Sequence, residues 1–172
     1  MDEPKLRESL GRFLSHDSFL VLASDDRFRI EKYPCYLVIN TGLSDSNGEN
    51  WISFVMTSPN SCLYFDSYGE PVNVYPNIIP PAQIFQENCK TLQSDESYTC
   101  GHFCIAFIYY LSTGGTYKNF LDHFTHNKEA NDNIAFNFVK RLVRKHIASS
   151  PKYSKTSRCM TCLCRSQYSS VV

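Results

Sequence analysis

Residues 93–104, QSDESYTCGHFC, decide the fold because they join a polar loop to the start of an apolar helix. Apolar side chains cover most of the circumference of a helix over 104–111, which is typical of a buried helix, and the glycine pair at 114–115 ends it. Cys100 is therefore expected in the first turn, where unpaired N–H groups and the helix dipole favour a thiolate, and Gly101 leaves room beside it. A cysteine nucleophile is usually mounted in this way; a buried structural cysteine is the alternative.

Three apolar runs of strand length precede this helix. They cover residues 35–41, 51–57 and 62–66, and the turn-forming residues 58–61 connect the last two as a hairpin. The segment 71–81 contains four prolines, so we expect it to cross the surface without regular structure.

Further helices are predicted on both sides of these strands. Apolar residues recur at helical spacing over 6–14 and 117–124. A third helix is expected to begin at the N-cap cluster 131–133 and to present an apolar stripe as far as residue 143. The sequence therefore predicts an α+β fold, with a central mixed or antiparallel sheet packed on the buried helix that starts at Cys100.

Composition limits the class of protein. The chain has 172 residues, of which 42% are hydrophobic, which is enough for one domain with a sizeable core. No apolar run is long enough for a transmembrane helix, so no membrane association is expected. Residues 1–13 are charged and lack the apolar centre of a signal peptide, which favours an intracellular protein that is not secreted.

The two ends of the chain differ in charge. Residues 1–139 carry nine Lys/Arg against seventeen Asp/Glu, whereas residues 140–172 carry eight Lys/Arg and no acid. A basic end on an acidic body indicates either self-association or contact with nucleic acid or another polyanion; a solvated helix end followed by a tail is the alternative. We expect residues 1–147 to form the folded domain and residues 148–172 a basic, Cys-rich, flexible tail.

The tail also contains three closely spaced thiols, Cys159, Cys162 and Cys164. A structural zinc site needs four ligands, and the fourth would come from His146 or from a second chain. Reversible disulfide formation or an unstructured tail competes with zinc binding. No cofactor is required elsewhere, and Cys89 and Cys104 are expected to be structural.

Several ordered motifs point to a known family. Trp51 at the head of a strand is followed by Phe-Asp-Ser-Tyr-Gly at 65–69, and then by Gln93 seven residues before the Cys-Gly pair at 100–101. This order resembles the adenovirus-type cysteine endopeptidases (adenain) and their relatives in Maverick/Polinton transposons and other DNA viruses. The likeness spans roughly residues 18–140. It implies an adenain/SUMO-protease-like fold.

The resemblance implies a role for each matched residue. Cys100 would be the nucleophile that attacks a peptide carbonyl. Gln93 would stabilise the oxyanion together with the backbone N–H of Cys100, and Asp66 would orient the catalytic base as the third member of a triad. The family has its base, a histidine, immediately before the tryptophan; this chain has Asn50 there.

Asn50 has no titratable nitrogen, so it can neither accept the thiol proton nor donate one to the leaving amine. A positioned general acid–base contributes roughly 10²–10⁴ in rate. A substitute base would have to come from His16, His102, His123 or His126, and His102 is expected to point away from Cys100 on the same helix.

Three functions follow from these residues. The first is a cysteine endopeptidase of the adenain type that cleaves viral or virus-derived structural precursor proteins, crippled by Asn50. The second is a catalytically degenerate module that binds a peptide, a capsid protein or nucleic acid. The third is a deubiquitinase-like or SUMO-protease-like hydrolase, which lacks the same base. The resemblance also implies an activating peptide, nucleic acid bound through the basic stretch 140–165, and a location in the host nucleus or the virion.

Overall fold

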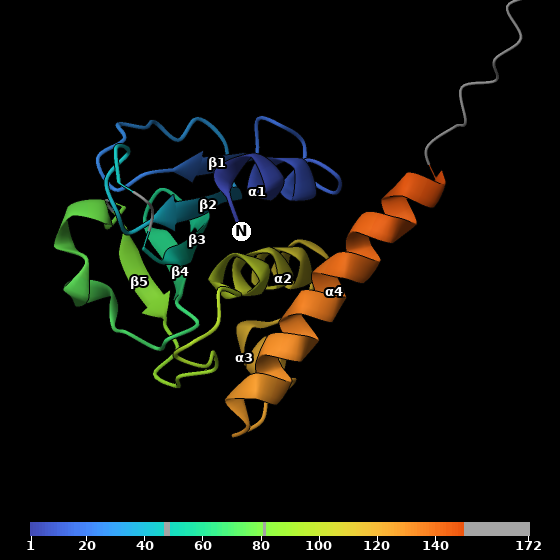
Figure 1. Ribbon diagram of the computed structural model, residues 1–172. Helices are drawn as coiled ribbons and strands as arrows, with labels where there is room; N and C mark the ends of the chain where they lie inside the picture. The colour runs from blue at the N-terminus through green and yellow to red at the C-terminus, as the bar shows by residue number, and fades with distance from the viewer. Residues whose placement is uncertain (47–48, 81, 150–172) are drawn as a thin grey trace, which may run out of the picture.

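The computed structural model describes residues 1–46, 49–80 and 82–149, which fold around a mixed five-stranded sheet (Figure 1). The strand order follows the sequence. The two edge pairs, β1–β2 and β4–β5, are parallel, whereas the inner pairs are antiparallel. The strands are β1 (Phe19–Leu22), β2 (Cys35–Asn40), β3 (Trp51–Ser58), β4 (Ser61–Phe65) and β5 (Gln83–Gln86). The predicted α+β class and mixed sheet are confirmed.

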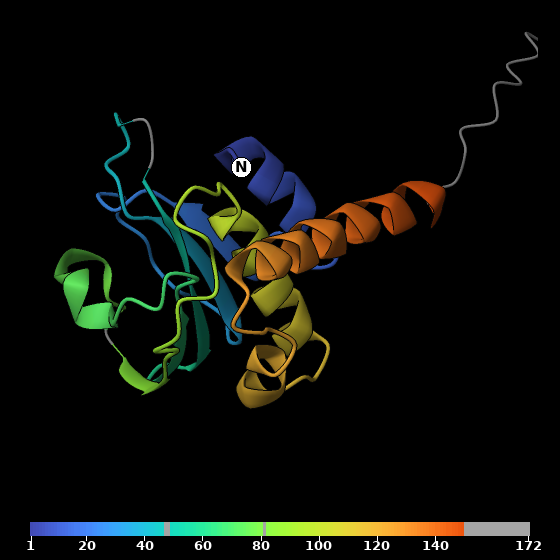
Figure 2. The same cartoon turned by 60° about the horizontal axis from the view of Figure 1, so that its bottom comes forward.

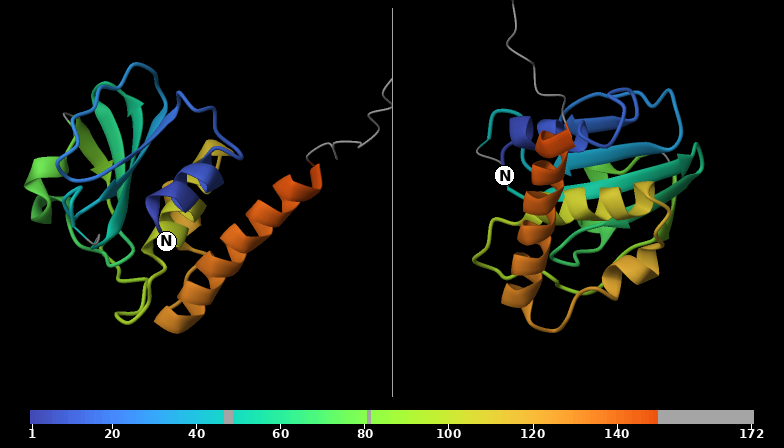
Figure 3. Two further views of the ribbon diagram at one scale, coloured as in Figure 1. Left: turned by 45° about the horizontal axis from the view of Figure 1, so that its top comes forward. Right: turned by 90° about the vertical axis from the view of Figure 1, so that its right-hand side faces the viewer.

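The helices gather on one face of this sheet, and Figure 3 shows the two layers edge-on. Helix α2 lies against β3, and the N-terminal helix and the long final helix both contact α2. The final helix crosses α2 and continues past the body of the protein (Figure 2). The helices are α1 (Glu3–Leu10), α2 (Cys100–Ser112), α3 (Tyr117–Leu121) and α4 (Lys128–Ser149).

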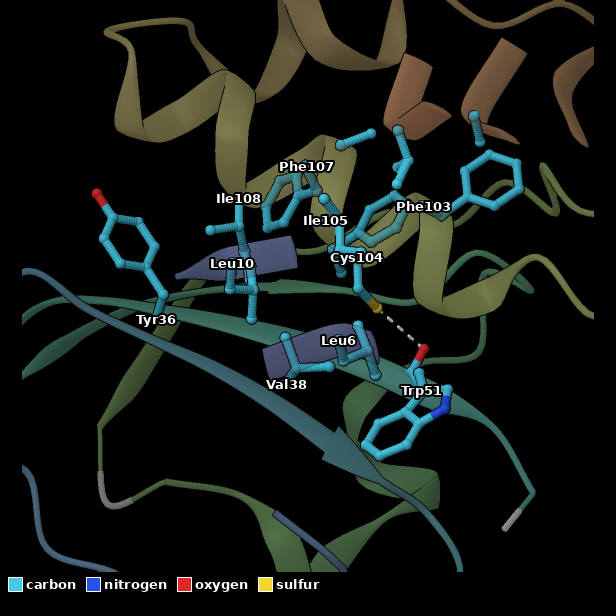
Figure 4. Packing of buried hydrophobic residues seen from close by; sticks show 14 of the residues in the cluster. Leu6, Leu10, Tyr36, Val38, Trp51, Phe103, Cys104, Ile105, Phe107 and Ile108 are labelled. Carbon is cyan, nitrogen blue, oxygen red and sulfur yellow. Dashed lines mark hydrogen bonds between the residues drawn. The ribbon is translucent and has the colours of Figure 1, made fainter. Parts of the chain in front are cut away.

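The central strands are buried on both faces, which explains why they read as continuous apolar runs in the sequence. Tyr36 and Val38 of β2 face the helices, and Figure 4 shows them with residues of α1 and α2. Leu37 and Ile39 face the opposite side, where the chain between β1 and β2 and the segment after β4 cover them. Two separate apolar clusters therefore hold the sheet in place.

Two details of the predicted secondary structure are wrong. The segment 71–81 contains two 3₁₀ turns, Val72–Val74 and Pro76–Ile78, and Ile78 is buried against the sheet because this segment covers its second face. The third helix does not begin at residues 131–133. Asn127 caps α4 instead, since its side chain accepts from the N–H of Ala130 at 2.8 Å.

The chain after α4 carries several predictions that lie outside the described residues. The expected end of the folded domain, residue 147, falls in the last turn of α4. The tail with Cys159, Cys162 and Cys164 follows residue 149, and the structure does not describe it. In the part of the chain that is described, no helix combines the length and the apolar character needed to cross a membrane.

Candidate active site

Cys100 begins α2 and faces the first residues of β3. The residue is 8% exposed, and Thr99 before it makes no capping hydrogen bond to α2 through its side chain. The backbone N–H groups of Trp51 and Gly101 are directed at the thiol and favour its ionised form. A Cβ atom at Gly101 would meet the Cβ of Met1 at 3.2 Å and Trp51 at 3.5 Å, so the chain itself occupies the space beside this glycine.

The environment of Cys100 favours the thiol over the thiolate. Burial raises the pKa of Cys100, and the negative charge of Asp66 acts in the same direction, whereas the two N–H groups lower it by less. The N–H groups at the helix start favour the thiolate as expected, but burial of the sulfur outweighs them. The dipole acts on a sulfur that has lost most of its contact with water.

Asn50 and Asp66 form a hydrogen-bonded pair at the ends of adjacent strands. The Nδ2 atom of Asn50 donates to Oδ1 of Asp66 at 3.0 Å. Because an ionised carboxylate only accepts, it fixes the amide with its nitrogen toward Asp66. The Oδ1 atom of Asn50 then points elsewhere, and it has no hydrogen-bond partner among the described residues. Asn50 thus contacts Asp66 as an imidazole N–H would, but its opposite end is a carbonyl oxygen.

Asp66 is fully buried in a tight polar pocket. Its carboxylate accepts from the backbone N–H of Tyr68 at 3.0 Å and from the hydroxyl of Tyr75 at 3.3 Å. The side chain of Asn88 holds the Asp66 backbone, with its Oδ1 accepting from the N–H at 3.0 Å. Burial raises the pKa of Asp66, and the bonds from Tyr68, Asn50 and Tyr75 oppose that rise.

The turn after β4 depends on a glycine. Gly69 has φ +73°, and a Cβ there would lie 2.6 Å from the carbonyl carbon of Lys90. Tyr75 and Asn88 come from segments in which no sequence pattern indicates a site, because their contact with Asp66 depends on the path of the chain around the sheet. Tyr68 lies in the Phe-Asp-Ser-Tyr-Gly motif, which was a signal available from the sequence.

Gln93 is fully buried, and both polar atoms of its side chain have hydrogen-bond partners. Its Nε2 atom donates to the Tyr68 hydroxyl at 3.0 Å and to the carbonyl of Ser97 at 2.9 Å, while Oε1 accepts from Ser67 at 2.7 Å. An amide nitrogen has two N–H donors, and both are taken. An oxyanion would have to displace one of these partners to receive a bond from Gln93.

The four histidines weighed as substitute bases lie elsewhere. His102 packs against Phe136 of α4 with a ring-centroid distance of 5.2 Å and tilted ring planes, and burial lowers its pKa to about 4. The ring of His16 lies by Phe19, the ring of His123 lies by Tyr110, and His126 is exposed. Among the residues whose side chains are described, no histidine lines the cavities beside Cys100.

Asp132, which was expected in a helix N-cap, instead fastens the loop before Cys100. Asp132 of α4 accepts from the hydroxyls of Ser94 and Thr99 at 2.6 Å and of Ser97 at 3.0 Å, and from the N–H of Ser94 at 3.3 Å. Three hydroxyl residues between 94 and 99 were visible in the sequence, but their common partner, 33 or more positions away, was not.

Two cavities flank the Asn50–Cys100 region. The larger, of about 670 Å³, is lined by Cys100, Trp51 and Tyr98, with four acidic residues at its margin. The second, of about 460 Å³, is lined by Asn50, Tyr68 and Tyr75. Glu49 lines both cavities, so the two lie next to each other, with Cys100 in the lining of the first and Asn50 in the lining of the second. We call these two neighbouring cavities, with their two sets of lining residues, the Cys100 groove.

Cys104 and Cys89, which were expected to be structural, differ in burial. The sulfur of Cys104 donates to the carbonyl of Trp51 at 3.2 Å (Figure 4) and is fully buried, which raises its pKa well above the usual value. Cys89 is exposed. Within residues 1–46, 49–80 and 82–149, no group of three or more His, Cys, Asp or Glu is placed to hold a metal ion.

Comparison with models of known protein families gives no match for this chain, and comparison with curated proteins gives none either.

Proposed function

We propose that the chain is a catalytically degenerate cysteine-protease-fold module that binds an extended peptide over Cys100 without cleaving it. The pair formed by Asn50 and Asp66 carries this proposal. The contact keeps the geometry in which a base would be oriented by a carboxylate, but the oriented group is an amide. An amide oxygen accepts a hydrogen bond and does not take up a proton at neutral pH.

The fold proposed for this module is the adenain/SUMO-protease-like fold. The observations that support it are the order of the motifs along the chain, the contact between Asn50 and Asp66, and the electrostatic effect of Asp66 on Cys100. Cys100 starts the helix packed on β3, Asn50 immediately precedes β3, and Asp66 immediately follows β4. Cavities of about 670 Å³ and 460 Å³ lie beside Cys100 and Asn50, a size in the usual range of ligand-binding pockets.

Two further features of the site favour binding over cleavage. The pKa of Cys100 is raised by burial, so the nucleophilic thiolate is the minor form at neutral pH. The donors of Gln93 are engaged by Tyr68 and Ser97, so the group expected to stabilise an oxyanion is not free. Base, nucleophile and oxyanion donor are thus each unfavourable for peptide hydrolysis.

The test is a library of capped octapeptides incubated with the native chain, with Cys100→Ser and with Asn50→His, followed by mass spectrometry. The native chain and Cys100→Ser should retain the same peptides and leave them intact. Asn50→His should cleave some of them, because it returns an imidazole next to Asp66. Cleavage by the native chain that Cys100→Ser abolishes would contradict the proposal.

That contradicting result would establish the second candidate function, a cysteine endopeptidase of the adenain type acting on viral or virus-derived structural precursors. The observation in its favour is that Asp66 and Cys100 remain at one site, with the N–H groups of Trp51 and Gly101 directed at the sulfur. The deubiquitinase-like or SUMO-protease-like alternative also needs a general base at position 50 and is tested by the same variants.

The second proposed partner is a polyanion, such as nucleic acid, on the basic stretch 140–165. The supporting observation is that Lys140, Arg141 and Arg144 are exposed on the second half of α4. Binding of a labelled single-stranded DNA should weaken steeply with salt and on replacement of these three residues by Gln. Unchanged affinity in the triple variant would remove this partner. An activating peptide, expected from the resemblance, remains a proposal.

A further inference from the structure

The Cys100 groove presents hydrogen-bond acceptors and negative charge to its occupant. Its larger cavity is lined by the carboxylates of Asp2, Glu3, Asp26 and Glu49, and the one cationic group in its described lining is the N-terminal ammonium of Met1. The second cavity adds Glu70 and Asp95. Lys128 is the single basic residue that the described part of the chain contributes to either cavity.

The carboxylates differ in how far they are neutralised by the protein. Asp2 and Glu3 form ion pairs with Lys5 and Arg7 of their own helix at 2.9 and 2.7 Å, and Asp95 lies 3.4 Å from Lys128. These pairs are solvent-exposed and therefore weak.

Asp26, Glu49 and Glu70 have no cationic partner among the described residues. Oδ2 of Asp26 accepts from the N–H of Ala23 at 2.7 Å, which leaves its charge in place. Three uncompensated carboxylates thus border the groove, and Glu49 lies where the two cavities meet.

An independent observation inside the groove points to the same kind of ligand. Asn50 lines the second cavity, is 8% exposed, and its Oδ1 atom has no partner among the described residues. A buried acceptor without a donor destabilises the folded protein. This oxygen is closed to solvent in the structure, so the N–H group of a ligand would reach it once the Asn50 side chain turns toward the second cavity. Both the peptide backbone and cationic side chains carry such N–H groups.

We propose that the Cys100 groove recognises an extended protein segment rich in lysine and arginine. The apolar walls formed by Trp51, Leu22 and Leu43 suit the methylene stems of these side chains, and the carboxylates at the margin suit their charged ends. The inference rests on the proposed peptide-binding function and names the class of peptide. Electrostatic complementarity of this kind sets specificity and association rate more than it sets total affinity.

The test uses two labelled octapeptides, AKAARAKA and AQAAQAQA, and fluorescence anisotropy with the full chain. The double variant Asp26→Asn with Glu49→Gln removes two groove charges and keeps side-chain size. The control, Glu31→Gln with Glu129→Gln, removes two charges from exposed positions that do not line the groove. AKAARAKA should bind and AQAAQAQA should not, with affinity about tenfold lower in the groove variant and changed less than about threefold in the control.

Failure of this inference differs from failure of the proposed function. Equal binding of both peptides, binding of neither, or an equal loss in the control variant would overturn the preference for basic segments. If AQAAQAQA protects Cys100 from alkylation as well as AKAARAKA does, peptide binding stands and the basic preference falls. If AKAARAKA binds selectively and the native chain cleaves it, the basic preference stands and the non-cleaving function falls.

Discussion

Replacing Asp132 by Ala should destabilise the protein and loosen the loop that leads to Cys100. The substitution removes four hydrogen bonds to a carboxylate, two of them at 2.6 Å. Bonds to a charged group contribute about 1.5–3 kcal/mol each. Because three of the donors are hydroxyls of half-buried residues that would regain water, we take less than the full sum, and the expected loss is about 3 kcal/mol.

Urea unfolding followed by fluorescence measures this loss. With a slope of about 2 kcal/mol per molar urea, the midpoint should fall by about 1.5 M. Alkylation of Cys100 in the absence of urea should accelerate, since Thr99 is one of the released residues. The control is Asp122→Ala, which removes an exposed pair with Lys118 and should cost at most about 0.5 kcal/mol. A urea midpoint for Asp132→Ala equal to that of the control would refute the claim that Asp132 fastens this loop.

Two other predictions concern the buried polar groups and one concerns the core. Burial raises the pKa of Asp66 in the folded protein above its value in the unfolded chain, about 3.9. Its protonated form therefore contributes stability that is fully present below the unfolded pKa and is lost as the pH rises through the folded pKa. In urea unfolding, Asp66→Asn should become less destabilising between pH 3.5 and pH 7. Gln93→Leu should cost about 2–3 kcal/mol by the same assay, because it removes the bonds to buried Ser67 and to half-buried Tyr68 and Ser97, and a loss under about 0.5 kcal/mol would argue against the network. Phe107→Ala should cost about 3–5 kcal/mol, since this fully buried ring stacks on Phe65 with centroids 4.8 Å apart.

The inner strands and the buried helix could be predicted from the sequence because each is specified by local apolar patterning. β2, β3 and α2 are long enough for their periodicity to be read without reference to the rest of the chain. The edge strands β1 and β5, of four residues each, were missed, because their pairing with β2 and β4 is set by tertiary contact.

The candidate site, like the fold, could be predicted where local sequence patterns specify it and not where tertiary contacts do. Cys100 and Asp66 were singled out because each lies at the end of a predictable element, whereas Asn50 and Gln93 were singled out through the resemblance to the adenain family. The protonation of Cys100 and Asp66 depends on burial, and the availability of the Gln93 donors depends on neighbouring side chains. The spacing of residues along the sequence reveals neither. For the same reason, the role of Asp132 became visible only once the loop it fastens was placed.

The most direct test of the account is the pH profile of Cys100 alkylation, followed by site-resolved mass spectrometry in the native chain and in Asn50→His. A thiol with a pKa above the usual value of about 8.5 is less than about 3% ionised at pH 7. An imidazolium beside it lowers the pKa by about 1–3 units, so Asn50→His should react at least about tenfold faster at pH 7. A native Cys100 that already reacts with a pKa well below 8.5, and is unchanged by Asn50→His, would contradict the claim that Asn50 keeps this site from catalysis.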